Sequence, residues 1–213
     1  MFNVFARRGG TMKLYITKTS PYARLARIVV LEKGLANEVE LIEAKTRAPG
    51  SPYYSINPSG RVPCLVRDDG QIMEDSQLIC ARLDALDGRP RLTPAYKAAD
   101  WAYGRLECHA RSMLDGIAVW AREVRRPDGE RSPGILQHEA DRALRMADSW
   151  EAEVGHPLMQ GPLNMAQMLL IAAIDMAAHR GMGDLTGNRA KLAVWARRVR
   201  KIPSVQATLP PGA

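Results

Sequence analysis

The chain has 213 residues, of which 46% are hydrophobic and 25% are charged, and its formal net charge is +7 at pH 7. This length is enough for one large domain or two small ones with a hydrophobic core, and no apolar run reaches the ~18 residues of a membrane-spanning helix. The three cysteines are too few and too scattered for a disulfide framework or a zinc cluster. With no signal-peptide pattern at its start, the sequence favours a soluble protein of the reducing cytoplasm.

The positive charge is spread along the chain rather than gathered in one arm. Lysine and arginine exceed aspartate and glutamate by three in residues 1–90 and by four in the remainder. The densest basic cluster, Arg197, Arg198, Arg200 and Lys201, is expected at the end of a helix, where cations interact favourably with the helix dipole. No base-stacking aromatics alternate with these charges. The sequence therefore predicts a solvated helix end and no nucleic-acid partner.

The first part of the chain alternates between strand-like and helix-like hydrophobic patterns. Gly34 ends the first helical pattern, and Asp68-Asp69-Gly70 is a turn of the kind that joins hairpin strands. A right-handed crossover would make the first two strands parallel, and the hairpin would add antiparallel neighbours. The pattern predicts an α/β layer, in the order strand 13–17, helix 22–33, strand 38–42, strands 62–67 and 71–73, and helix 76–86.

The second part of the chain has a helical period throughout. Thr93-Pro94 and Ser132-Pro133 each place a hydroxyl before a proline at the first helical position. Leu163 to Met168 is typical of a capping box within a hydrophobic staple, in which Asn164 caps the helix and Gln167 reaches back to it. The predicted organisation is a disordered extension at residues 1–12, an α/β domain at 13–87, a linker at 88–92 and an all-helical domain at 93–213.

Five segments occur in the order found in the glutathione S-transferase superfamily, which this chain resembles from about Lys13 to Pro210. They read "TSPYARLARIV", "NPSGRVPCLV", "EDSQLICARLD", "LNMAQMLLIAAID" and "IPSVQATLPP". The closest resemblance is to bacterial serine-type members with theta-like or zeta-like features. It implies a thioredoxin-like N-terminal domain, an all-α C-terminal domain, glutathione as co-substrate and a homodimer.

Ser20 immediately precedes Pro21 and the first helical pattern. Serine at such a position often satisfies the N–H groups of the first helical turn, and this structural role is the simplest interpretation. In the family that the chain resembles, the catalytic hydroxyl lies at this point. The resemblance therefore implies that Ser20 is catalytic and donates a hydrogen bond to the thiolate of glutathione.

The chemistry sets an energetic requirement for such a hydroxyl. A thiol with a pKa near ~8.5 is only a few per cent thiolate at neutral pH, and lowering that pKa by about two units requires roughly 2.7 kcal/mol. A hydrogen bond to a charged group supplies about 1.5–3 kcal/mol, and a helix N-terminus adds about 0.3–1 kcal/mol. One serine hydroxyl at a helix start therefore nearly suffices, without a neighbouring histidine.

Three other hydroxyls, those of Tyr15, Thr19 and Tyr22, are alternative donors to the thiolate. Tyr15 lies within the first predicted strand and Tyr22 one residue into the helix, and tyrosine-type transferases use a tyrosine for this purpose. Omega-like and glutaredoxin-like relatives carry a cysteine where this chain has Ser20. A serine at that position argues against thiol–disulfide exchange.

Val62-Pro63 is the second motif of the resemblance. In the resembling folds this proline is cis, and the residue before it offers its backbone N–H and C=O to the cysteinyl part of glutathione. The alternative is a plain bend that opens a strand, where proline is allowed. The preceding turn, Asn57-Pro58-Ser59-Gly60, would set the approach of this backbone.

Asp75-Ser76 is the third motif, at the start of the second predicted helix. Ser76 can donate its hydroxyl and N–H to the γ-glutamyl carboxylate, and a carboxylate can bind the α-ammonium group. Glu74 precedes Asp75, so which of the two reaches the ligand stays open, and an acidic helix cap is the structural alternative. The candidate cations for the glycyl carboxylate are Arg61, Lys45 and Arg47.

The electrophile pocket is expected between the domains, against the helix from Pro94 to Arg125. Its candidate residues are Tyr22, Tyr103, His109 and Met113, although a core or surface role is the competing interpretation for the last three. Cys64 follows Pro63 and is interpreted as a buried small hydrophobe. The four histidines show no metal-ligand spacing, and no metal is expected.

These residues together predict a cytoplasmic glutathione S-transferase. Its thiolate would attack an unidentified hydrophobic electrophile, at a halide-bearing or conjugated carbon, or a peroxide, in a detoxification reaction. Two alternatives remain open. One is a non-catalytic module of the same fold that serves binding or protein association. The other is a zeta-like isomerase, which is less favoured because the serine and cysteine paired with tryptophan or histidine of that group are missing around Ser20.

Overall fold

The structure, a computed structural model, describes residues 11–89, 91–92 and 101–212. The chain divides into two compact units, Met1–Leu83 and Asp84–Ala213, of which the first is α/β and the second is helical. The predicted fold classes are thus confirmed. Of the predicted extension, residues 1–10 lie outside the described residues and Met12 belongs to the first strand. The predicted Thr93-Pro94 cap also lies outside them.

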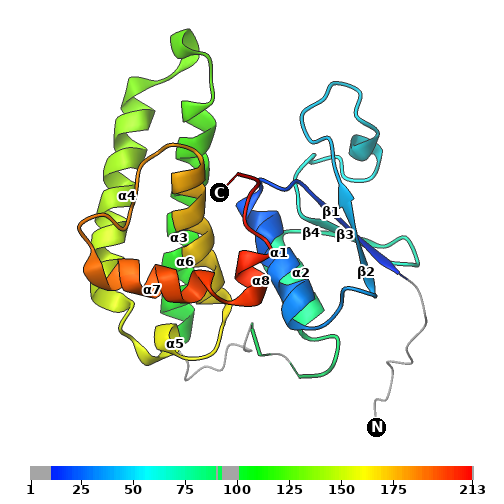
Figure 1. Ribbon diagram of the computed structural model, residues 1–213. Coiled ribbons are helices and arrows are strands. Elements are labelled where there is room, and N and C mark those ends of the chain that lie inside the picture. The colour runs from blue at the N-terminus through cyan, green and yellow to red at the C-terminus, as the bar shows by residue number, and fades with distance from the viewer. Residues whose placement is uncertain (1–10, 90, 93–100, 213) are drawn as a thin grey trace. The chain divides into compact units, whose positions relative to one another are not determined.

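The α/β unit is built on a four-stranded sheet with the strand order β2-β1-β3-β4 (Figure 1). β1 and β2 are parallel, and the pairs β1–β3 and β3–β4 are antiparallel, as the crossover and hairpin patterns predict. The elements are β1 (Met12–Ile16), α1 (Pro21–Glu32), β2 (Val39–Glu43), the 3₁₀ helix η1 (Pro52–Ser55), β3 (Cys64–Val66), β4 (Ile72–Glu74) and α2 (Ser76–Asp84).

Successive side chains of β1 point to opposite faces of the sheet, so this strand packs on both faces. Leu14 and Ile16 are buried on the face that α1 and α2 cover (Figure 1), and α1 adds its own buried side to this core. Tyr15 points to the opposite face, where its ring packs against Tyr53 of η1 with 5.5 Å between centroids. Tyr53 and Cys64 are the centre of a second, smaller core on that face.

The helical unit is organised around α6, whose residues are buried nearly throughout. α3 packs along α6 and α4, and α7 packs on α4 and α6. Figure 1 shows α3, α4 and α6 as the long helices of this unit. The elements are α3 (Trp101–Val124), the 3₁₀ helix η2 (Asp128–Glu130), α4 (Pro133–Glu153), α5 (Pro157–Gln160), α6 (Met165–His179), α7 (Ala190–Arg200) and α8 (Pro203–Gln206).

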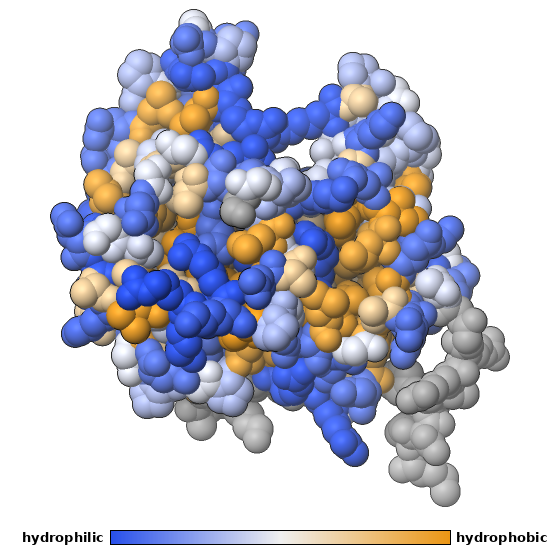
Figure 2. All heavy atoms as spheres, viewed as in Figure 1, coloured by the Kyte–Doolittle hydropathy of each residue, from blue (hydrophilic) through white to orange (hydrophobic). Residues whose placement is uncertain are grey.

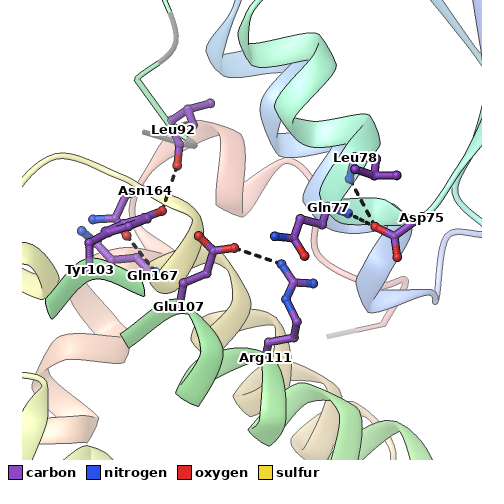
Figure 3. Close-up of polar contacts among 9 residues, drawn as sticks. All are labelled: Asp75, Gln77, Leu78, Leu92, Tyr103, Glu107, Arg111, Asn164 and Gln167. Atoms are coloured by element: carbon purple, nitrogen blue, oxygen red, sulfur yellow. Dashed lines mark hydrogen bonds and ion pairs between the residues drawn. The ribbon is translucent and has the colours of Figure 1, made fainter. Parts of the chain in front are cut away.

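The segment after α2 is held by a buried carboxylate. Asp84 is fully buried and accepts the backbone N–H groups of Arg91, at 3.0 Å, and Leu92, at 2.8 Å. The Leu92 carbonyl accepts the backbone N–H of Met165 at 2.8 Å, at the start of α6, and the Tyr103 hydroxyl at 3.5 Å (Figure 3). These bonds fix part of the predicted linker within the helical unit.

Two predicted helix caps are confirmed, and one predicted bond is wrong. Ser132 caps α4 by accepting the Ile135 N–H at 3.3 Å, and Asn164 caps α6 by accepting the Gln167 N–H at 3.2 Å. The Gln167 side chain does not return the bond, because its amide nitrogen is turned away toward three backbone carbonyls. These belong to Leu158, Gly161 and Pro162, at 3.0, 3.3 and 2.8 Å.

The basic cluster of α7 is partly structural. Arg198 donates to the carbonyls of Met159, at 2.6 Å, and Gln160, at 3.3 Å, and Arg200 pairs with the buried Asp175 at 2.6 Å. On the face shown in Figure 2, strongly hydrophilic residues lie over α7. Half of this cluster therefore anchors α7 to its neighbours. In the described part of the chain, no helix is both long and apolar enough to cross a membrane.

Gln167→Glu should lower the free energy of unfolding by about 3–5 kcal/mol at pH 7, because it would bury an unpaired carboxylate against three carbonyl oxygens. The loss should shrink as the pH falls, because the buried carboxyl becomes protonated and can donate, and it should reach its minimum near pH ~4, the ordinary pKa of the carboxyl in the unfolded chain. Urea denaturation measures both effects. Gln206→Glu, at an exposed position of α8, is the matched control and should change stability by less than about 0.5 kcal/mol. Equal losses in the two variants would contradict this role of Gln167.

Candidate functional site

Three predicted motifs meet at one end of the sheet. β1 and β4 run in the same direction, since each is antiparallel to β3. Ser20 follows the carboxyl end of β1, and Asp75 follows the carboxyl end of β4. Val62 precedes the amino end of β3, which lies at the same end of the sheet as the carboxyl end of β1. The topology therefore places a hydroxyl, the backbone that leads into β3 and a carboxylate around one region.

Ser20 is the N-cap of α1. Its Oγ accepts the Ala23 N–H at 3.2 Å, and Pro21 occupies the first helical position. This confirms the capping role, and it leaves the hydroxyl hydrogen unused, because no described residue accepts it. A serine hydroxyl can accept and donate at once. The side chain is half-buried, so the donor is within reach of a ligand.

The charge environment of Ser20 favours an anion. The first turn of α1 contains no acidic residue, so no carboxylate of that turn offsets the positive end of the helix dipole. The helix is 12 residues long, which is enough for this end effect. A negatively charged group placed beside Ser20 would be stabilised both by the hydroxyl and by the dipole.

The three alternative hydroxyls lie in different surroundings. Tyr15 has its ring in the small core with Tyr53, on the sheet face opposite to Leu14. Thr19 and Tyr22 flank the start of α1 and are both half-buried. When these three residues are compared with Ser20, only Ser20 combines a helix-cap position with a hydroxyl hydrogen that no described residue accepts.

The Val62-Pro63 peptide bond is cis, as the resemblance implies. Pro63 is buried and Val62 is half-buried, directly before β3. Neither the N–H nor the C=O of Val62 has a hydrogen-bond partner among the described residues. A backbone segment that leads into a strand with both of these groups unpaired can bind an extended backbone through main-chain hydrogen bonds.

The turn before Val62 is held by a carboxylate. Glu74 Oε2 accepts the Ser59 hydroxyl at 2.5 Å and the Asn57 amide at 3.0 Å. These hydrogen bonds lower the pKa of Glu74 below its ordinary value. Tyr53, which the sequence interpretation missed, donates its hydroxyl to the Arg61 carbonyl at 2.5 Å. The sequence pattern that could have indicated this residue is Ser51-Pro52. Ser51 caps η1 and Pro52 follows it, as Ser20 and Pro21 do at α1.

Asp75 caps α2 and has an unusual backbone conformation. Its φ is +78°, the only positive φ at a described residue other than glycine. Its Oδ1 accepts the N–H groups of Gln77 at 2.8 Å and Leu78 at 3.2 Å (Figure 3), whereas Oδ2 has no partner among the described residues. Ser76 is buried at the first position of α2. Such strained residues cluster at ligand sites.

The three candidate cations, Lys45, Arg47 and Arg61, are exposed residues of the α/β unit. None forms an ion pair with a described residue, so each can bind a ligand carboxylate. Arg61 is distinguished by its sequence position, since it directly precedes the unpaired Val62 backbone. The described residues contain no group of three or more His, Cys, Asp and Glu side chains that could hold a metal ion.

The candidate pocket residues of α3 lie inside the helical unit to different degrees. Tyr103 and Met113 are almost fully buried. His109 is half-buried, bonds to the Ser149 hydroxyl at 3.0 Å and packs on the Trp150 ring at 4.8 Å. Burial lowers the pKa of His109, which favours the neutral imidazole. These contacts give all three residues a packing role.

Comparison with known proteins gives the family. Residues 14–91 match the family described as glutathione S-transferase, N-terminal domain. An uncharacterized GST-like protein of Escherichia coli, YibF, is 27% identical over 164 residues, which are 76% of this chain and 80% of that protein. Glutathione S-transferase 2 of Saccharomyces cerevisiae is 26% identical over 211 residues, 93% of this chain and 89% of that protein.

A solved structure extends this similarity to the whole fold. It is a glutathione transferase family member from Pseudomonas fluorescens Pf-5, with bound S-(propanoic acid)-glutathione. It is 26% identical to this chain, with a TM-score of 0.83, and the match covers 94% of this chain and 100% of that one. The chain therefore has the fold of the glutathione S-transferase superfamily, and residues 14–91 match the N-terminal domain of that family.

The thiols of this chain should differ sharply in reactivity. Cys64 and Cys80 are fully buried, and burial raises the pKa of the Cys64 thiol, whereas Cys108 is exposed. Iodoacetamide at pH 7.5 should therefore alkylate native protein at Cys108 alone, and unfolded protein at all three positions, as mapped by peptide mass spectrometry. Labelling of Cys64 as fast as Cys108 would contradict its interpretation as a buried hydrophobe.

Proposed function

We propose that the protein is a glutathione S-transferase of the serine type, in which Ser20 stabilises the glutathione thiolate. The observation that carries this proposal is the hydroxyl hydrogen of Ser20, which no described residue accepts although the same oxygen caps α1. The hydroxyl donates to sulfur while the helix N-terminus adds its positive potential. Ser20 keeps its own proton throughout, and the thiol proton leaves to solvent.

The remaining motifs bind the tripeptide in this proposal. The backbone of Val62, held before Pro63, pairs with the cysteinyl residue in the manner of a strand. Asp75 binds the α-ammonium group through Oδ2, and Ser76 donates to the γ-glutamyl carboxylate. Arg61 or Lys45 binds the glycyl carboxylate. Support comes from the relative from Pseudomonas fluorescens, which holds a glutathione conjugate in a similar fold.

The transfer step is a nucleophilic attack by the bound thiolate. A sulfur–carbon bond forms at an electrophilic carbon while halide leaves or a conjugated double bond takes up the electron pair, or sulfur attacks a peroxide oxygen and the O–O bond breaks. Of the four proposed pocket residues, Tyr22 and His109 are half-buried, while Tyr103 and Met113 are core residues. Burial therefore disfavours Tyr103 and Met113 as residues that contact an electrophile.

The second candidate function is a non-catalytic module that binds glutathione or another protein with the same fold. Retention on immobilised glutathione, together with conjugation of a generic aryl halide, separates the two functions. Binding without turnover favours the module. We also propose that the protein is a cytoplasmic homodimer, as the resemblance implies, and sedimentation of the purified chain tests its oligomeric state.

Ser20→Ala should lower kcat/KM for glutathione by about tenfold to a hundredfold, the loss of one hydrogen bond to a charged group. It should also cost about 1 kcal/mol of stability through the lost cap. Ser132→Ala is the matched control, because Ser132 caps α4 in the same serine–proline setting. It should lose a similar amount of stability and no activity. Aryl halide conjugation and urea denaturation measure the two effects. Equal activity in Ser20→Ala and wild type would rule out Ser20 as the thiolate donor.

Asp75→Asn should weaken glutathione binding by about tenfold or more, because it removes the negative charge that pairs with the α-ammonium group. Stability should change by less than about 1 kcal/mol, since asparagine keeps the capping oxygen and tolerates a positive φ. Isothermal titration calorimetry measures the affinity. Asp69→Asn is the control, because Asp69 also accepts a backbone N–H, from Gln71 at 3.0 Å, in a different turn. Unchanged affinity in Asp75→Asn would assign the ammonium group to another carboxylate.

A further inference from the structure

The carbonyl of Arg61 is held by two side chains. The Tyr53 hydroxyl donates to it at 2.5 Å, and the Asn57 amide donates to it at 3.1 Å. Tyr53 and Asn57 are both buried, at 4% exposure each. Two donors from buried side chains on one oxygen define the orientation of the Arg61–Val62 peptide group.

This orientation determines where the Val62 N–H points. The Arg61 carbonyl and the Val62 N–H belong to one peptide group, and Val62-Pro63 is the only cis bond among the described residues. In a trans peptide the C=O and N–H point in opposite directions within a rigid plane. A carbonyl held toward Tyr53 and Asn57 therefore directs the Val62 N–H away from them. This N–H is the donor that the proposed function assigns to glutathione.

Glu74 links this peptide to the end of β4. Its Oε2 accepts from Asn57 at 3.0 Å, which orients the same amide group that donates to Arg61. The same oxygen accepts the Ser59 hydroxyl at 2.5 Å, and Ser59 Oγ in turn accepts the Arg61 N–H at 3.2 Å. Asn57 Oδ1 accepts the Ser59 N–H at 3.2 Å. One carboxylate oxygen thus sits at the centre of a closed network that holds both sides of Arg61.

The turn itself has little freedom to adjust. Gly60 has a φ of +64°, and a Cβ added there would lie 2.8 Å from Cε1 of Tyr54. The Tyr54 hydroxyl is tied to the Thr46 carbonyl at 3.0 Å, so the ring is anchored at its far end. Because Tyr54 confines Gly60, the conformation of this turn depends mainly on how the Asn57 and Ser59 side chains are oriented.

We propose that Glu74 is a positioning residue for glutathione, which orients the Val62 N–H through Asn57, Ser59 and the Arg61 carbonyl. The inference rests on the proposed function, since it assumes that Val62 binds the tripeptide. It assigns the two neighbouring carboxylates separate roles, in which Glu74 holds the binding backbone and Asp75 contacts the ligand. Glu74 does not itself touch the substrate.

The test compares Glu74→Ala and Glu74→Gln with Glu43→Ala in the full-length protein. Glu43 is a matched control, because it also ends an edge strand and pairs at 3.4 Å with an exposed side chain, Lys18, away from the turn. Glu74→Ala should raise the KM for glutathione and its calorimetric Kd by about tenfold, with kcat nearly unchanged. Glu74→Gln keeps an acceptor of the same length and should stay within about threefold of wild type.

Backbone amide exchange of residues 57–62 gives a readout that does not depend on glutathione. Glu74→Ala should speed exchange in this segment by about tenfold, while Glu43→Ala leaves it unchanged. Failure of wild type to bind glutathione would overturn the proposed function and this inference with it. If wild type binds and Glu74→Ala leaves either the exchange or the glutathione affinity unchanged, the positioning role alone is overturned. A fall in kcat equal to that of Ser20→Ala would also contradict it.

Discussion

The proposed site depends on one oxygen atom, which caps a helix and in our proposal also binds the ligand. Ser20 Oγ accepts the Ala23 N–H through a lone pair and keeps its hydrogen for another acceptor. Fixing the oxygen as a helix cap removes much of the rotational freedom of the hydroxyl before any ligand arrives. The entropy of ordering the donor is therefore lost during folding rather than during binding.

Strand direction explains why three distant segments converge. Two reversals, β1 to β3 and β3 to β4, bring the carboxyl ends of β1 and β4 and the amino end of β3 to one end of the sheet. Each of the three segments contributes different chemical groups to this region. A helix start supplies a hydroxyl and positive potential, an irregular strand entry supplies unpaired backbone groups, and a second helix start supplies Asp75 and Ser76. The adjacent residues Glu74 and Asp75 act in opposite directions from there, one toward the turn and one toward α2.

Local sequence signals predicted most of this arrangement. Serine before proline marked the starts of α1 and α4, and the alternating pattern predicted a parallel first pair of strands and an antiparallel hairpin. The cis Val62-Pro63 bond followed from the family resemblance. What escaped prediction were side-chain contacts that no local pattern indicates. The bond from Asn57 to Glu74 spans 17 residues. The Gln167 amide donates to carbonyls of the segment before α6 and not to its own helix cap. Likewise, helical spacing alone could not separate a pocket role from the observed burial of Tyr103 and Met113.

The most direct test of the central claim is the pKa of the glutathione thiol when it is bound to the protein. Thiolate absorbance in the ultraviolet, followed against pH at saturating glutathione, measures this pKa without an electrophile. A hydroxyl donor at a helix N-terminus predicts a value about two units below the ordinary ~8.5 of a thiol, and a value restored by at least one unit in Ser20→Ala. A bound thiol that titrates at its ordinary pKa in wild type would contradict the claim.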